Sequence, residues 1–172
     1  GVGKSTLLRT LAGLWPYAKG NVYLPKEEEF LFLPQRPYLP LGSLRQAISY
    51  PVVEEVISEK YSDEEIKEIL IACKLENLAD KLDIVDDWSR ILSLGEQQRI
   101  AFVRILLYRP EFVFLDEATS ALDEDLEGNL YDMLKFHLPN TKIISIAHRS
   151  SLIAKHQVIL RLKEKGCWEI HE

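Results

Sequence analysis

The residues Gly1-Val2-Gly3-Lys4-Ser5-Thr6, followed by Leu7-Leu8, decide the fold of this chain. They match the second half of the pattern G-x-x-x-x-G-K-[ST], in which a glycine-rich loop turns its backbone N–H groups onto nucleotide phosphates. Apolar residues then recur at helical spacing, and Gly13 and Pro16 are suited to end that helix. A helix that begins at such a loop directs its N–H groups and the positive end of its dipole toward a phosphate.

This loop predicts particular chemistry for its side chains. The Lys4 ammonium would reach the terminal phosphates, and the Ser5 hydroxyl would hold Mg²⁺, a hard cation that prefers oxygen ligands. The alternative is that the glycines mark an ordinary turn. We predict a nucleotide-binding segment formed by Gly1, Val2, Gly3, Lys4, Ser5 and Thr6. The first glycine of the pattern would precede residue 1, so we expect the chain to be a fragment of a longer protein.

The composition is that of a globular domain with an attached lobe. The chain has 172 residues, of which 47% are hydrophobic and 28% are charged. Its net charge of -6 argues against nonspecific nucleic-acid binding, which needs a basic surface. Cys73 and Cys167 are far apart and lack metal-ligand spacing, so we expect free thiols in a reducing compartment. No apolar run approaches the roughly 20 residues that a membrane span needs.

Apolar runs alternate with helical patterns along much of the chain. Continuous runs predict strands of a parallel sheet that is covered on both faces. The expected strands are Asn21–Leu24, Phe30–Leu33, Phe112–Leu115, Ile143–Ile146 and Val158–Leu160, with a helix over Asp125–His137. Residues 42–108 carry mostly helical signals, including the capping box that starts at Ser62. We therefore predict an α/β fold with a core from 1–41 and 109–172 and an inserted helical subdomain over 42–108.

Two carboxylates, Asp116 and Glu117, follow a predicted buried strand. Ligands of open α/β sheets bind at the carboxyl ends of strands. One carboxylate could hold Mg²⁺, and the next could polarise an attacking water as general base. The alternative is that the pair caps the next helix. His148 follows the next apolar strand and could donate a hydrogen bond to a γ-phosphate, although a lone histidine there could equally be a surface or core residue.

A second helix start is predicted at Ser93, which forms a capping box with Glu96. Gly95 in the same turn would allow close approach of a phosphate to the helix N-terminus. Ser93 could serve as a cap and as a phosphate ligand at once.

In this order, the motifs resemble the nucleotide-binding domain of ABC (ATP-binding cassette) transporters over essentially the whole chain. The matching segments are Gly1–Thr6 (Walker A), Gln35 (Q-loop), Leu92–Gln98 (signature), Phe112–Glu117 (Walker B), Ser120–Asp123 (D-loop) and His148 (switch histidine). The resemblance implies a P-loop NTPase of the RecA-like type, with the N-terminal part of the domain before residue 1. It also implies ATP as substrate and Mg²⁺ as cofactor.

The family pattern also implies roles and partners. Two such domains would pair head to tail, as an expected homodimer, and ATP binding would close the pair while hydrolysis reopens it. Ser93 and Gly95 would contact ATP bound to the other domain, and Asp123 would connect the two sites. The implied catalytic residues are Glu117, His148 and Gln35, and the implied metal ligands are Ser5, Gln35 and Asp116.

The signature departs from the common Leu-Ser-Gly-Gly-Gln, because Leu94 and Glu96 replace a glycine and the glutamine. Finer similarity, as in Leu33–Pro40 and Leu92–Arg99, is to fused permease–ATPases of the SbmA/BacA type and to peroxisomal fatty-acyl transporters. This implies a transmembrane domain fused N-terminally and a location at the cytoplasmic face of the plasma (inner) membrane. Residues 36–48 would help grip that domain.

Two other classes of protein stay open. One is a soluble ABC-type ATPase of the translation-factor or DNA-repair class, although the chain lacks the sustained heptads of the repair proteins. The other is a non-enzymatic interaction module, against which Glu117 and His148 argue. We expect the isolated 172-residue chain to be inactive as an ATPase.

Overall fold

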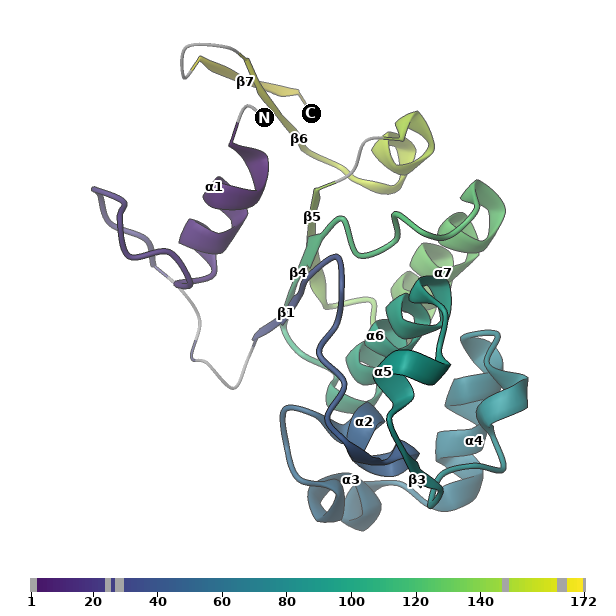
Figure 1. Cartoon of the computed structure of the whole chain (residues 1–172). Helices are drawn as coiled ribbons and strands as arrows, with labels where there is room; N and C mark the ends of the chain where they lie inside the picture. The colour runs from purple at the N-terminus through teal and green to yellow at the C-terminus, as the bar shows by residue number, and fades with distance from the viewer. Residues whose placement is uncertain (1–2, 24–25, 27–29, 147–148, 164–166, 172) are drawn as a thin grey trace.

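The computed structural model describes residues 3–23, 26, 30–146, 149–163 and 167–171. Its centre is a parallel sheet with the strand order β1-β4-β5 (Figure 1). The strands are β1 (Phe30–Leu33), β4 (Phe112–Asp116) and β5 (Lys142–Ile146). In register, Leu33 lies beside Leu115 and Asp116 beside Ile146. The three strongest strand predictions are therefore confirmed, and the carboxyl ends of all three strands meet at one edge.

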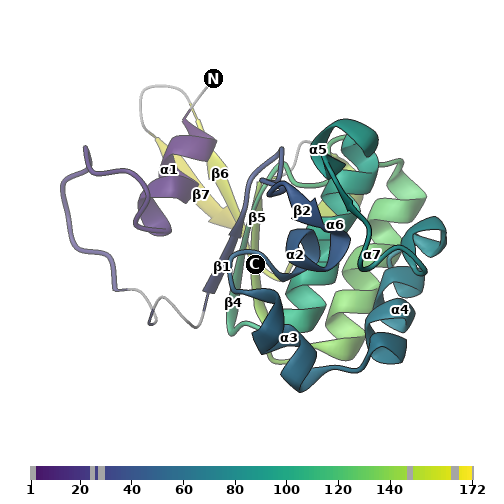
Figure 2. The ribbon, with the colours of Figure 1, turned by 60° about the horizontal axis from the view of Figure 1, so that its bottom comes forward.

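Helices cover both faces of this sheet (Figure 2). Helix α1 (Lys4–Leu11) packs Leu8 against Phe114 on one face. The alternate strand residues, such as Leu33 and Leu115, face a larger core under α6 (Leu94–Tyr108) and α7 (Glu124–His137). This alternation follows from the period of two in strands, which sends successive side chains to opposite faces.

The region between β1 and β4 is helical, as predicted. Its elements before α6 are β2 (Gly42–Ser43), α2 (Leu44–Ser49), α3 (Glu54–Lys60), α4 (Asp63–Ala72), η2 (Glu76–Leu78), β3 (Val85–Asp86) and α5 (Trp88–Ile91). Capping boxes start α2 at Ser43, α4 at Ser62 and α6 at Ser93. The buried residues of this region join the core beneath the sheet, and α6 is the helix that links them.

Two weaker strand predictions were wrong in their pairing or extent. Residues 21–23 form no helix or strand, and Leu24 lies outside the described residues. After the turn η3 (Ser150–Lys155), β6 (Ile159–Leu162) pairs antiparallel with β7 (Trp168–His171) instead of joining the parallel sheet. Strand pairing depends on distant partners, which an isolated apolar run does not specify.

The two cysteines differ in their exposure to solvent. Cys73 is a buried free thiol and Cys167 an exposed one. Burial raises the pKa of the Cys73 thiol to about 12. Within the described ranges, no helix combines the length and the apolar character that crossing a membrane requires.

Candidate nucleotide site

Helix α1 begins directly after Gly3, the last glycine of the predicted phosphate loop. Gly3 is the N-cap residue with φ 88°, in the left-handed region that glycine adopts without a Cβ penalty. Lys4, Ser5 and Thr6 form the first turn, which contains no acidic side chain. The positive end of the helix dipole is therefore not neutralised by that turn. Gly1 and Val2 lie outside the described residues.

The end of β4 meets the first turn of α1. The Ser5 hydroxyl donates to Oδ1 of Asp116 at 2.8 Å, and Arg9 pairs with Oδ2 at 3.1 Å. Asp116 is 3% exposed, so its charge is held by these two groups inside the fold. Ser5 and Asp116, which are far apart in the sequence, thus lie together in one polar centre.

Glu117 follows directly in an unusual backbone conformation. Its φ is 54°, in the left-handed region that few non-glycine residues adopt. Its N–H donates to the Ile146 carbonyl at 3.3 Å, and its own carbonyl accepts from Ser120 N at 3.1 Å. The chain therefore turns sharply at Glu117, so the Asp-Glu pair does not simply cap a helix; the cap of α7 is Asp123, whose Oδ1 accepts from Leu126 N at 2.8 Å.

Gln35 follows β1 and lies beside the turn after Glu117. Its Nε2 donates to Ser120 Oγ at 3.2 Å. Gln98 of α6 donates to the same Ser120 oxygen at 3.1 Å and to the Gln35 carbonyl at 2.8 Å. The predicted Q-loop and D-loop are therefore in contact, with α6 bonded to both.

Ser93 and Gly95 begin α6, on the face of the sheet opposite α1 (Figure 2). Glu96 turns back to the cap, since its Oε2 accepts from Ser93 N at 2.9 Å and Ser93 Oγ at 2.7 Å. Burial acts to raise the pKa of Glu96, but the hydrogen bonds from Ser93 and Asn77 outweigh it and hold that pKa below its usual value. Gly95 lies close to the 120–123 turn, where an added Cβ would lie 3.4 Å from Ala121 O.

The segment after β5 is tied to the same turn. Arg149 donates to the Leu122 carbonyl at 2.6 Å and lies 3.5 Å from the buried carboxylate of Glu127. Thr119 donates to that carboxylate as well. His148, the predicted switch histidine, lies outside the described residues, so its role stays a prediction.

Sequence reasoning gave no role to Arg9, Gln98 or Arg149. Arg9 had a usable signal, because it lies four residues after Ser5 and so on the same face of α1. Gln98 had only its place at the end of the signature segment, because a glutamine in an amphipathic helix is expected on the solvent face and not in the core.

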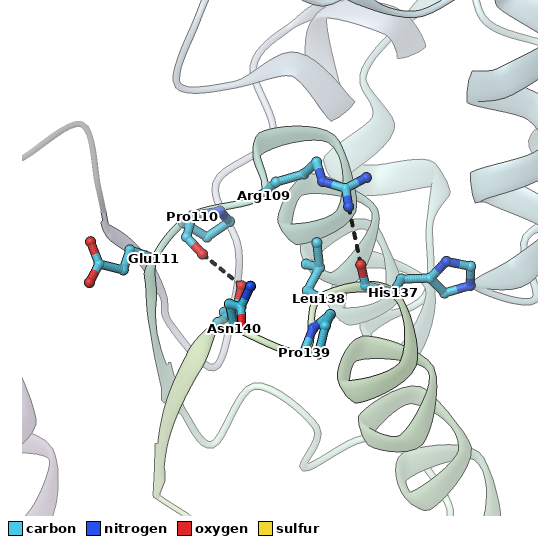
Figure 3. Close-up of a pocket in the computed structure, with 8 residues that line it drawn as sticks. Arg109, Pro110, Glu111, His137, Leu138, Pro139 and Asn140 are labelled. Atoms are coloured by element: carbon cyan, nitrogen blue, oxygen red, sulfur yellow. Dashed lines mark hydrogen bonds between the residues drawn. The ribbon is translucent and has the colours of Figure 1, made fainter.

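Two hollows were found, one far from this centre and one that reaches Lys4 in the first turn of α1. A cavity of about 300 Å³ between residues 109–111 and 137–141 lies where β4 and β5 begin, far from Asp116 at the end of β4 (Figure 3). Arg109 closes it by donating to the His137 carbonyl. A groove of about 770 Å³ runs between α1, β5, η3 and β6, with a largely aliphatic lining. Among the residues that the structure describes, no cluster of three His, Cys, Asp or Glu side chains suits a metal.

Similar proteins are numerous. The sequence model of the family described as ABC transporter matches residues 1–120. An ABC transporter ATP-binding protein of Haemophilus influenzae is 49% identical over 99% of this chain and 28% of its own length. ATP-binding cassette sub-family D member 1 of Drosophila melanogaster is 37% identical over 100% of this chain and 24% of its own length.

A solved structure agrees with these relatives. A bacterial Atm1-family ABC exporter with ATP bound superposes with a TM-score of 0.75 at 26% identity, over 92% of this chain and 30% of the exporter chain. The chain thus spans about a quarter of the length of the curated relatives it matches. With a P-loop helix, a parallel sheet and the motif order in place, this chain belongs to the ABC transporter family.

Proposed function

We propose that this chain binds and hydrolyses ATP to power movement of a solute across a membrane. Membership of the ABC transporter family carries ATP hydrolysis as a general activity. The observation that carries the proposal is the hydrogen bond from Ser5 to Asp116, which joins the start of α1 to the end of β4. It puts a helix N-terminus, a buried carboxylate and the adjacent Glu117 at one edge of the sheet.

The residues at this edge fit a magnesium ion. Mg²⁺ takes oxygen ligands and is usually held by one or two protein groups together with substrate phosphates. We propose Ser5, Asp116 and Gln35 as the protein groups that hold it. When bound, the ion would neutralise charge on the β- and γ-phosphates. The carboxylate of Asp116 supports this assignment, because its two present partners are a hydroxyl and a cation.

The remaining chemistry belongs to side chains of the chain. Lys4 and the N–H groups of the loop would bind the phosphates, with Gly1, Val2, Gly3 and Thr6 completing the loop. Glu117 would accept a proton from the attacking water, which is the role of a general base. His148 would orient the γ-phosphate and that water. Gln35 would contact the same water.

The position of α6 supports a shared site between two domains. Helix α6 lies on the far side of the sheet from α1 (Figure 2), and we propose that Ser93 and Gly95 at its start contact ATP held by a second domain. We propose a head-to-tail homodimer that closes on ATP and reopens on hydrolysis, with Asp123 linking the two sites. In this arrangement 1–41 and 109–172 act as the core and 42–108 as the helical subdomain.

A membrane partner would dock beside the Q-loop. Tyr38 and Leu41 there are 60% and 75% exposed. Arg104 of α6 anchors this segment by donating to the Tyr38 carbonyl at 2.7 Å and to the Ala47 carbonyl. We propose that residues 36–48 receive a transmembrane domain that is fused N-terminally, at the cytoplasmic face of the membrane. A soluble ABC-type ATPase is not favoured, since the named relatives are transporters or their ATP-binding proteins.

Replacement of Glu117 by glutamine in the full-length protein tests the proposal. The amide keeps the size of the side chain but cannot accept the proton, so ATP binding should persist while turnover falls by about 10²–10⁴-fold. Steady-state phosphate release and equilibrium nucleotide binding measure the two quantities. Turnover near the wild-type rate would remove Glu117 from its assigned role.

A further inference from the structure

Gln98 makes an unusual set of contacts for a helix residue. It is fully buried in α6 and lies five residues after the N-cap residue Ser93. Its Nε2 donates to Gln35 O at 2.8 Å and to Ser120 Oγ at 3.1 Å. Its Oε1 accepts from Ala121 N at 2.9 Å. Both N–H groups and the carbonyl of this amide are thus used on other segments.

The contacts of Gln98 close a ring of three segments. The Gln35 side chain also donates to Ser120 Oγ, at 3.2 Å. Gln35 in the loop after β1, the turn after β4 and the helix α6 are therefore joined through one buried amide. Because a buried polar group that loses its partner is costly, the three segments favour one fixed arrangement.

The neighbouring Gln97 shows that burial alone does not demand such contacts. Its Nε2 donates to Ser89 O and Leu92 O, both at 2.9 Å, on the stretch that leads into its own helix. Gln97 stabilises the start of α6 locally. Gln98 instead connects α6 to the two loops that flank the Asp116 centre.

We infer that Gln98 is a positioning residue that couples the N-terminus of α6 to Gln35 and to the 120–123 turn. The inference rests on the proposed function, in which Gln35 contacts the Mg²⁺ and the attacking water at one nucleotide while Ser93 and Gly95 contact another nucleotide. A helix is stiff over five residues, so a shift of its first turn moves the Gln98 amide. Because the amide is bonded to the Gln35 backbone and to the Ala121 N–H, both groups then move with it. The start of α6 and the Gln35 loop therefore change position together.

Gln98→Met in the full-length protein tests this coupling, because methionine fills a similar volume without hydrogen-bonding the three partners. We expect the dissociation constant for metal-free ATP, measured with EDTA, to stay within twofold of wild type, because the loop around Lys4 and Ser5 is not contacted by Gln98. We expect kcat to fall at least tenfold. A fall in kcat with unchanged nucleotide binding separates positioning from general loss of structure.

Tyr108→Phe is the matched control. Tyr108 lies at the other end of α6, and its hydroxyl accepts from Val52 N at 2.9 Å and donates to the Ser49 carbonyl. The change removes buried hydrogen bonds from the same helix without touching a nucleotide motif. We expect a lowered unfolding temperature and a kcat within twofold of wild type. Equal kcat losses in the two variants at equal thermal shifts would overturn the inference, as would a Gln98→Met kcat within twofold of wild type.

Gln98→Glu provides a second variant should Gln98→Met not fold. A carboxylate still accepts from Ala121 N but faces the Gln35 carbonyl without a donor, so the coupling to Gln35 is lost and kcat should again fall at least tenfold. An unchanged kcat in this variant would contradict the inference. The proposed function fails separately, when the wild type does not hydrolyse ATP or when Glu117→Gln turns over normally.

Discussion

The left-handed backbone at Glu117 yields a prediction about stability that is independent of turnover. A φ of 54° puts the Cβ of an ordinary residue too close to the carbonyl oxygen, at a cost of roughly 1–2 kcal/mol. Asparagine tolerates this region because its short side chain can hydrogen-bond locally. The longer side chain of glutamine does not provide this local hydrogen bond. Glu117→Asn and Glu117→Gln both remove the carboxylate, so their difference reports the backbone.

We expect Glu117→Asn to be more stable than Glu117→Gln by about 0.5–1 kcal/mol, taking half of that cost as recovered. For a urea slope of about 1–3 kcal/mol per molar, the unfolding midpoint should rise by about 0.2–1 M. Pulse proteolysis of the full-length protein across a urea series measures the midpoint of the ATP-binding region. Both variants should lack turnover, so the gain in stability would come with loss of the general base.

Glu117→Ala is the control for side-chain size. Alanine also shortens the side chain, but it is strained at positive φ like other residues with a Cβ. It should therefore resemble glutamine and not asparagine. If alanine gained as much as asparagine, or if asparagine gained nothing, the reasoning from backbone strain would be refuted.

Three further predictions concern thiol access, metal and pH. Because Cys73 is buried with a pKa of about 12 and Cys167 is exposed, a thiol reagent should label Cys167 in the native state and Cys73 only after denaturation, as peptide mass spectrometry would report. Asp116→Asn should weaken MgATP binding at least tenfold but metal-free ATP binding far less, in titrations with and without EDTA; equal losses would contradict the magnesium assignment. The folded state lowers the pKa of Glu96, so its stabilising effect is present above its unfolded pKa and is lost as pH falls through the lower folded value. Because this carboxylate is only partly buried, solvent screening limits the effect, and Glu96→Gln should cost no more than about 0.5 kcal/mol at neutral pH. The gap to wild type should narrow in acid unfolding curves, and a gap that persists would argue against the charged cap.

The parts of the fold that local chemistry specifies were predictable from the sequence. The runs Phe30–Leu33 and Phe112–Leu115 are apolar throughout because both faces of the central sheet are covered. The capping boxes at Ser62 and Ser93 formed as predicted, since each is closed within four residues. The strand predicted at Val158 was wrongly expected in the parallel sheet. Its partner, β7, is determined by tertiary contacts and not by the residues of the strand itself.

The candidate site was predictable where a motif carries its own chemistry. The Ser5–Asp116 contact follows from joining a P-loop helix to a strand that ends in a carboxylate. The ring around Gln98 could not be predicted, because α6 is buried on nearly all sides and a buried glutamine there breaks the expected amphipathic pattern. Hydrogen bonds between distant loops leave no periodic trace in a sequence.

The parallel pairing of β1 with β4 has a consequence for synthesis on the ribosome. Leu31 pairs with Val113, so roughly 80 further residues must be synthesised after β1 before its partner strand exists. At typical elongation rates this takes about 4–16 s. The helices between them make their contacts over shorter distances and are free to assemble earlier. During that interval an apolar strand is available for wrong pairing. Substitutions that slow the docking of α6 should therefore reduce the yield of native protein during expression more than they reduce its stability once folded.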